Sequence, residues 1–168
     1  MNVRWLAPIS CRNRLLGGTG TLAYAGRMYR RDYILRLIER FGQMLIALRN
    51  RILRREPDSH EARAEIHEMA RSAGLDLDVA RQLDPQTLLL WLAPGDDVDE
   101  PKLWLMAELL YLEGLHAQTA GGPDAGRGDL TRALAVFGRL PAGWRPHADL
   151  PSAGERVDEI RQSIAAAR

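Results

Sequence analysis

The sequence predicts an all-α protein, a single bundle of five to six helices. Three observations support this fold class: apolar residues recur at helical spacing in the segment 32–55, helix-capping residues divide the rest of the chain into helix-length pieces, and no strand-like alternation is present. In the segment 32–55 the apolar residues recur at steps of three and four: Ile34, Ile38, Phe41, Leu45, Leu48 and Ile52. This spacing places them on one face of a helix.

The apolar face of this first helix is wider than a coiled-coil seam. Leu37 and Met44 extend it, which favours packing into a bundle core over pairing of two isolated helices. Pro57 ends the helix shortly after Arg55.

Caps and breakers delimit the remaining helices. Asp58 with Glu61 and Ser152 with Glu155 have the spacing of capping boxes, and Gly74 is a C-terminal stop. Asp84-Pro85 and Asp99-Glu100-Pro101 each combine a capping residue with a proline of the first turn. We therefore expect helices over 58–73, 85–92, 100–120 and 129–140 and from 152 onward, with a brief helical turn before Leu83.

The domain organisation follows from composition. Residues 1–27 lack sustained periodicity, and we expect a disordered extension or a wrongly assigned start, with Met28 the true beginning. Residues 28–168 form the helical domain, with its core over 28–140 and a C-terminal linker and helix over 141–168. The single cysteine, Cys11, suits a reducing compartment, and no segment has the features of a signal peptide or a membrane span, so we expect a cytoplasmic protein.

Charge is unevenly distributed although the net charge is only +1. The segment 27–55 holds nine arginines and two acidic residues, a balance of +7, whereas the chain from Glu56 onward has a balance of −9. In one interpretation the basic helix packs against the acidic remainder. In the other, its arginines form an exposed face that meets an anionic partner.

No catalytic, cofactor or metal site is predicted. His60 and His67 are two helical turns apart, too far for one ion without help from another segment. Glu108 and Glu113 interrupt the apolar fourth helix, and we interpret them as a polar stripe on its exposed side in preference to a buried acid or a di-metal site. The absence of nucleophile and phosphate-loop motifs argues against an enzyme, although an enzyme of unfamiliar type stays open.

The fourth and fifth helices resemble a tetratricopeptide repeat. Gly114 and Gly121 have the spacing of the repeat's first helix and turn, Ala133 and Phe137 that of its second helix, and Leu130 takes a position that is often aromatic. The resemblance implies two antiparallel helices that cross closely at small residues. A helical hairpin that reached this pattern by convergence is the alternative.

The segment 28–39, Met-Tyr-Arg-Arg-Asp-Tyr-Ile-Leu-Arg-Leu-Ile-Glu, resembles the start of an uncharacterised bacterial family of small helical proteins. Members of that family end in a tetratricopeptide-like hairpin, and the similarity extends from Met28 to about Leu140. The resemblance implies the fold and supports Met28 as the start, but it implies no activity.

The leading functional hypothesis is a protein–protein interaction module with no enzymatic activity and no cofactor. Trp91, Trp104 and Trp144 are its candidate anchors for a protein partner. The alternative is non-specific binding of nucleic acid or an anionic surface, which we consider the less favoured, through Arg36, Arg40, Arg49, Arg51, Arg54 and Arg55. A homodimer formed through the first helix is a further possibility.

Overall fold

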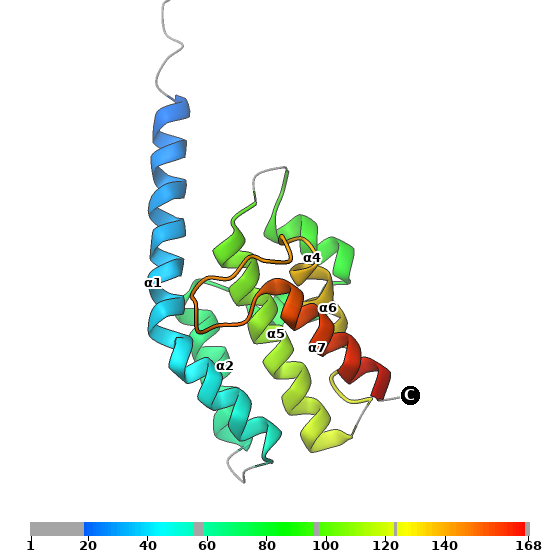
Figure 1. Ribbon diagram of the computed structural model, residues 1–168. Coiled ribbons are helices and arrows are strands. Elements are labelled where there is room, and N and C mark those ends of the chain that lie inside the picture. The colour runs from blue at the N-terminus through cyan, green and yellow to red at the C-terminus, as the bar shows by residue number, and fades with distance from the viewer. Residues whose placement is uncertain (1–18, 56–58, 96–97, 123, 167–168) are drawn as a thin grey trace, which may run out of the picture.

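The described part of the protein is entirely helical. The computed structural model (Figure 1) describes residues 19–55, 59–95, 98–122 and 124–166, with the side chains of residues 19–30 and 59–60 excepted. These residues form seven helices and no strand: α1 Thr19–Leu53, α2 Ser59–Ser72, α3 Leu77–Gln82, α4 Pro85–Leu92, α5 Glu100–Gly121, α6 Arg127–Phe137 and α7 Ala153–Ala166. The all-α prediction is confirmed, and α3 is the segment that was expected as a brief helical turn.

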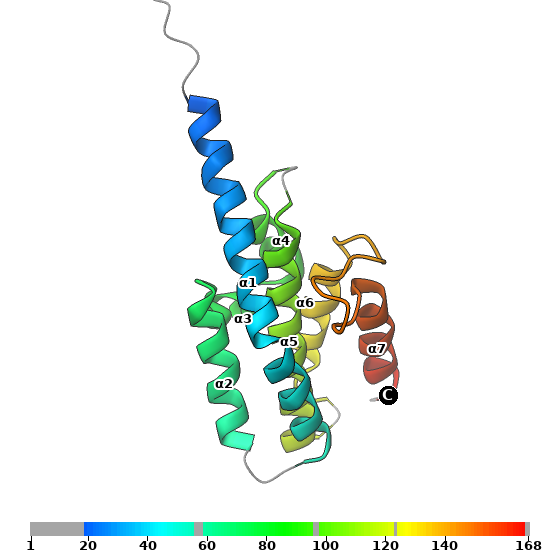
Figure 2. The same ribbon diagram turned by 60° about the vertical axis from the view of Figure 1, so that its left-hand side comes forward.

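Helix α5 lies at the centre of the fold. In Figures 1 and 2 it passes between α1 and α2 on one side and α6 and α7 on the other. Every residue from Leu103 to Leu115 is buried, as the nearly continuous apolar sequence requires. No helix in the described ranges combines the length and apolar character needed to cross a bilayer.

Helix α1 packs on α5 and α2 through the face predicted from the sequence. All the residues that define this face are buried: Ile34, Leu37, Ile38, Phe41, Leu45, Leu48 and Ile52. The expectation that Met44 widens the face is wrong, because its side chain is 45% exposed. The helix begins at Thr19, upstream of the segment 32–55 in which it was predicted, and its first turns project beyond the other helices in both views (Figures 1 and 2).

The geometry of two predicted helix ends can be compared directly with the sequence, whereas the helix predicted over 129–140 is shifted and spans Arg127–Phe137. Gly74 has a φ of +65°, the left-handed conformation that terminates a helix. At the start of α7 the Ser152 amide and hydroxyl donate to the Glu155 carboxylate, and the Glu155 amide donates back to the Ser152 hydroxyl. This capping box is confirmed, whereas the box predicted at Asp58 lies outside the described residues.

The crossing of α5 and α6 depends on two glycines. A Cβ at Gly126, whose φ is +79°, would collide with the backbone carbonyl of Gly114. A Cβ at Gly114 would lie 2.7 Å from the Leu130 side chain. The two helix backbones can therefore approach closely at this point.

The prediction for Glu108 and Glu113 is wrong. Both side chains are buried, with exposures of 1% and 2%. Helix α5 has no exposed stripe over this stretch because other helices cover it on all sides, so each carboxylate must find a partner inside the protein.

The packing of α1 can be tested by truncating one core side chain. We expect Ile38→Ala to lower the free energy of unfolding by roughly 2–5 kcal/mol, because Ile38 is fully buried. Met44→Ala, on the exposed face of the same helix, should change it by no more than about 0.5 kcal/mol. Urea denaturation followed by circular dichroism measures both, and equal losses would contradict the packing.

Candidate partner-binding site

Helix α4 begins at a strong cap. The Asp84 carboxylate accepts hydrogen bonds from the amides of Gln86 and Thr87, at 3.0 and 3.1 Å, and from the Thr87 hydroxyl. Pro85 occupies the first turn, where its missing N–H costs no hydrogen bond. Because both signals are local in sequence, the start of this helix was predicted correctly.

One side of α4 is buried and the other is not. Leu88 and Leu92 are in the core, whereas Leu90 is 69% and Trp91 is 42% exposed. Gln86, Thr87 and Pro94 are exposed as well, at helical spacing from Leu90 and Trp91. We name the surface formed by Gln86, Thr87, Leu90, Trp91 and Pro94 the α4 patch.

The α4 patch differs in charge from the chain around it. None of its five residues is ionisable, although 27% of the whole chain is charged. From Asp84 to Glu100 the sequence holds five acidic residues and no basic one. The hydrogen bonds from Thr87 hold the pKa of Asp84 below its usual value, so the end of the patch carries a negative charge at neutral pH.

The other two candidate tryptophans lie elsewhere. Trp104 is completely buried in α5, where its Nε1 donates to the Pro151 carbonyl at 3.3 Å and its ring packs edge-on against Phe137. Trp144 is partly buried and packs against the core. Of the three predicted anchors, Trp91 is therefore the most accessible.

The six predicted arginines divide into two groups. Arg49 forms an ion pair with Glu159, and Arg51 forms one with Glu65 at 2.8 Å. Together with the pair of Arg31 and Glu100, at 3.1 Å, these contacts show α1 lying against acidic residues downstream, as one interpretation predicted. The remaining four of the six predicted arginines are exposed: Arg36, Arg40, Arg54 and Arg55.

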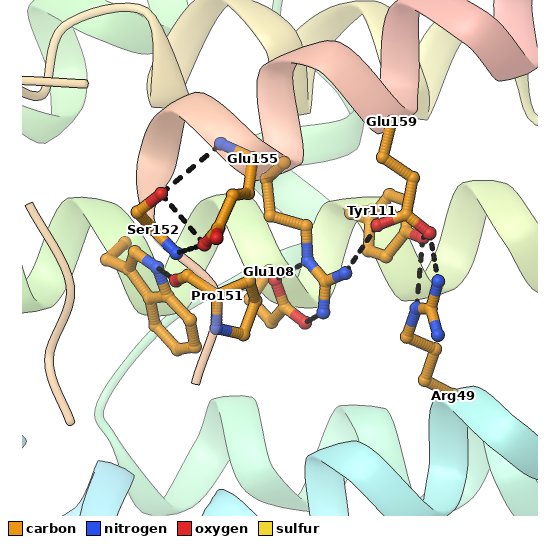
Figure 3. Close-up of polar contacts among 9 residues, drawn as sticks. Arg49, Glu108, Tyr111, Pro151, Ser152, Glu155 and Glu159 are labelled. Carbon is orange, nitrogen blue, oxygen red and sulfur yellow. Dashed lines mark hydrogen bonds and ion pairs between the residues drawn. The ribbon is translucent and has the colours of Figure 1, made fainter. Parts of the chain in front are cut away.

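A polar network attaches α7 to α5 and α1 (Figure 3). The buried Arg156 guanidinium makes two contacts with the Glu108 carboxylate, one of them from Nε to Oε2 at 2.8 Å, and lies 4.5 Å above the Tyr111 ring. Glu159 accepts from Arg156, from the Tyr111 hydroxyl and from Arg49. Two carboxylates and two guanidiniums thus balance each other at this interface.

The network controls the ionisation of its members. Burial alone would lower the pKa of Arg156, but the Glu108 carboxylate together with Tyr111 and Glu159 outweighs burial and raises it. Burial alone would raise the pKa of Glu159, but the hydrogen bonds from Tyr111 and Arg49 together with the charge and hydrogen bond of Arg156 outweigh burial and lower it. Burial raises the pKa of the Tyr111 hydroxyl. The raised pKa of Arg49 and Arg156 and the lowered pKa of Glu159 therefore favour the charged forms of these three residues, and the raised pKa of Tyr111 favours its neutral form.

Glu113 lies in a second network. Its carboxylate lies 3.2 Å from Arg81 of α3, 3.5 Å from Arg63 of α2 and 3.2 Å from His67 of α2. Arg81 also binds the Asp129 carboxylate of α6, with Nη2 to Oδ2 at 3.0 Å. Within the described part of the chain, no three His, Cys, Asp or Glu side chains are placed to hold a metal ion.

The pairing of these carboxylates was not predicted from the sequence. Arg156 and Glu159 are spaced by three residues on one helix face, a weak signal that two charges point the same way. Arg156 is 48 residues from Glu108 in the sequence, and no local pattern joins them. The same is true of Arg81 and Asp129.

Removal of one partner of the buried ion pair between Arg156 and Glu108 should destabilise the folded protein. We expect Arg156→Ala to lower the free energy of unfolding by roughly 3–5 kcal/mol, because Glu108 would be left buried without its guanidinium. Arg161→Ala, on the exposed side of α7, should change it by no more than about 0.5 kcal/mol.

Replacing both Glu108 and Arg156 by leucine separates the cost of the unpaired charge from the loss of packing. We expect this double variant to be more stable than Arg156→Ala, because no unpaired charge remains. Chemical denaturation of the three variants measures the differences. A double variant that is less stable than Arg156→Ala would contradict the burial of Glu108.

In comparisons with protein-family models, with curated proteins and with solved structures, no match to this chain was found. The function is therefore inferred from the geometry of the chain itself.

Proposed function

We propose that this protein is a non-enzymatic interaction module that binds a protein partner through the α4 patch. The observation that carries the proposal is the exposure of two large apolar side chains, Leu90 and Trp91, next to each other on one short helix. The other large exposed apolar side chains of the described residues are distributed singly over α1 and α3: Tyr33, Met44, Leu53 and Val79.

The physical basis is the free energy of apolar surface in water. Burying such surface contributes roughly 25 cal/mol per Å², and tryptophan supplies a large rigid area for it. Tryptophan is also enriched among the residues that dominate binding energy at interfaces. Gln86 and Thr87, which belong to the patch, offer polar groups to a partner backbone without introducing a charge.

The arginine face of α1 supports binding of an anionic partner less well. Arg49 and Arg51 are occupied by Glu159 and Glu65, which leaves Arg36, Arg40, Arg54 and Arg55 as the exposed members of the proposed set. Glu39 is exposed on α1 between Arg36 and Arg40 and reduces the positive potential there. We therefore favour the protein partner over nucleic acid.

We further propose that the α5–α6 hairpin is tetratricopeptide-like and that the protein belongs with the bacterial family that the segment 28–39 resembles, acting in the cytoplasm. Support comes from the close approach at Gly114 and Gly126 and from the burial of Leu130, Ala133 and Phe137 in α6. Of these residues, Gly114, Leu130, Ala133 and Phe137 occupy positions that carry the resemblance to the repeat, whereas Gly126 lies in the turn between the two helices.

Affinity capture from native cell extract tests the α4 patch. We expect the wild-type protein to retain at least one partner that Trp91→Gln does not retain, since loss of a tryptophan anchor costs on the order of 2 kcal/mol or more, about thirtyfold in affinity. The matched control is Met44→Gln, because Met44 is 45% exposed on α1, outside the α4 patch.

Circular dichroism should show the same helix content in both variants. Capture of the same proteins by wild type and Trp91→Gln, or capture of none by the wild type, would contradict the proposed function.

A further inference from the structure

We propose that the partner at the α4 patch is a second copy of this chain, bound across a two-fold axis in a weak and reversible dimer. The inference rests on the proposed function of the α4 patch. It assigns the occupant of the patch, which the exposure of Leu90 and Trp91 alone does not specify. The charge, the symmetry and the size of the patch each support a second copy.

The α4 patch can face its own copy without opposing like charges. No ionisable residue lies within four positions of Leu90 or Trp91 in either direction. A two-fold interface brings residues near the axis close to their own equivalents, so that a charge at this place is repelled by its copy. Each of the other large exposed apolar side chains in the described ranges has an exposed charged residue within four positions: Tyr33 has Asp32, Met44 has Arg40, Leu53 has Arg54 and Val79 has Asp78.

The apolar face of α1, through which a dimer was predicted, is not exposed to a second copy. Ile38, Leu45 and Leu48 of this face are buried within their own chain, with exposures of 1% or less. Pairing through this face would require α1 to leave the core. The α4 patch is exposed in the folded chain and requires no such opening.

The order of residues along α4 fits an antiparallel pair of helices. Leu90 is at the centre of the patch, four residues after Gln86 and four before Pro94. With the two-fold axis beside Leu90, this side chain meets Leu90 of the second copy, and Trp91 lies between Leu90 and Thr87 of the second copy. Each member of the patch then lies against an uncharged residue.

The described acids near α4 are compatible with this arrangement. Asp84 precedes Leu90 by six residues, so the two Asp84 residues of an antiparallel pair are about 18 Å apart along the helix axes. This separation exceeds the screening length of about 8 Å at physiological ionic strength. After the patch, Asp99 caps α5 and Glu100 is paired with Arg31, so both acids are engaged within their own chain.

The size of the patch predicts a weak dimer. Stable interfaces bury about 800 Å² on each partner and involve roughly 20–30 residues a side, many more than the α4 patch contains. Association through Leu90 and Trp91 is therefore reversible and depends on protein concentration. Added salt should not weaken it, because no opposite charges meet across the patch.

Analytical ultracentrifugation of the full-length protein between about 5 and 500 μM tests the inference. We expect the mean mass to rise from that of one chain towards that of two, both at low and at high salt. Trp91→Gln should raise the dissociation constant at least about tenfold, because a symmetric dimer loses the anchor from both copies. The matched control is Met44→Gln, which lies outside the patch and should leave the dissociation constant unchanged.

Disulfide trapping tests the position of the two-fold axis. In a Cys11→Ser background, which removes the single native cysteine, Leu90→Cys should form a disulfide-linked dimer under mild oxidation. Such a bond requires Cβ atoms about 3.5–4.5 Å apart, a separation that is met only close to the axis. The matched control is Met44→Cys in the same background, which should form little linked dimer on non-reducing electrophoresis at the same concentration.

The two proposals fail in different ways. A protein that is monomeric at every concentration would overturn the second copy, as would a dimer that Trp91→Gln leaves intact or equal trapping of Leu90→Cys and Met44→Cys. Each of these results is compatible with Trp91-dependent capture of a different protein from cell extract, which would keep the proposed function. Failure of the proposed function would instead appear as capture that does not depend on Trp91.

Discussion

The burial of α5 on all sides is the constraint on which the rest of the structure depends. Its sequence from Leu103 to Leu115 offers no polar face to solvent, so α1, α2, α3 and α6 pack around it. Glu108 and Glu113 interrupt this stretch and are buried with it. A buried carboxylate is stable only when it is paired. Arginines of α2, α3 and α7 therefore lie against α5, where they form ion pairs with these two carboxylates.

The exposed surfaces of α1 and α4 are the sides of these helices that do not pack against the core. Helix α1 is long enough to cover α5 and still present Arg36 and Arg40 to solvent, whereas Arg49 and Arg51 are drawn into ion pairs with the acidic part of the chain. Helix α4 is buried on one side only: Leu88 and Leu92 face the core, and Leu90 and Trp91 remain outside although they are apolar. The exposure of Leu90 and Trp91 beside the buried Leu88 and Leu92 is the basis of the proposed binding role.

Structural features that depend on local sequence patterns were predicted correctly. Features that depend on contacts between residues distant in the sequence were not. The face of α1, the stop at Gly74 and the caps at Asp84, Asp99 and Ser152 follow from residues a few positions apart. The exposure of Trp91 did not follow, because a run of apolar residues does not indicate which side of a helix the rest of the chain covers. The pairing of Glu108 with Arg156 was equally hidden, since 48 residues separate them.

Native-state hydrogen exchange of the backbone amides tests the central position of α5 most directly. The amides of residues 103–115 should exchange slowest, with opening free energies close to that of global unfolding, while the amides of α4 exchange faster, since α4 has one face in solvent. Exchange in α5 that is as fast as exchange in α4 would contradict a fold organised around a central helix buried on all sides.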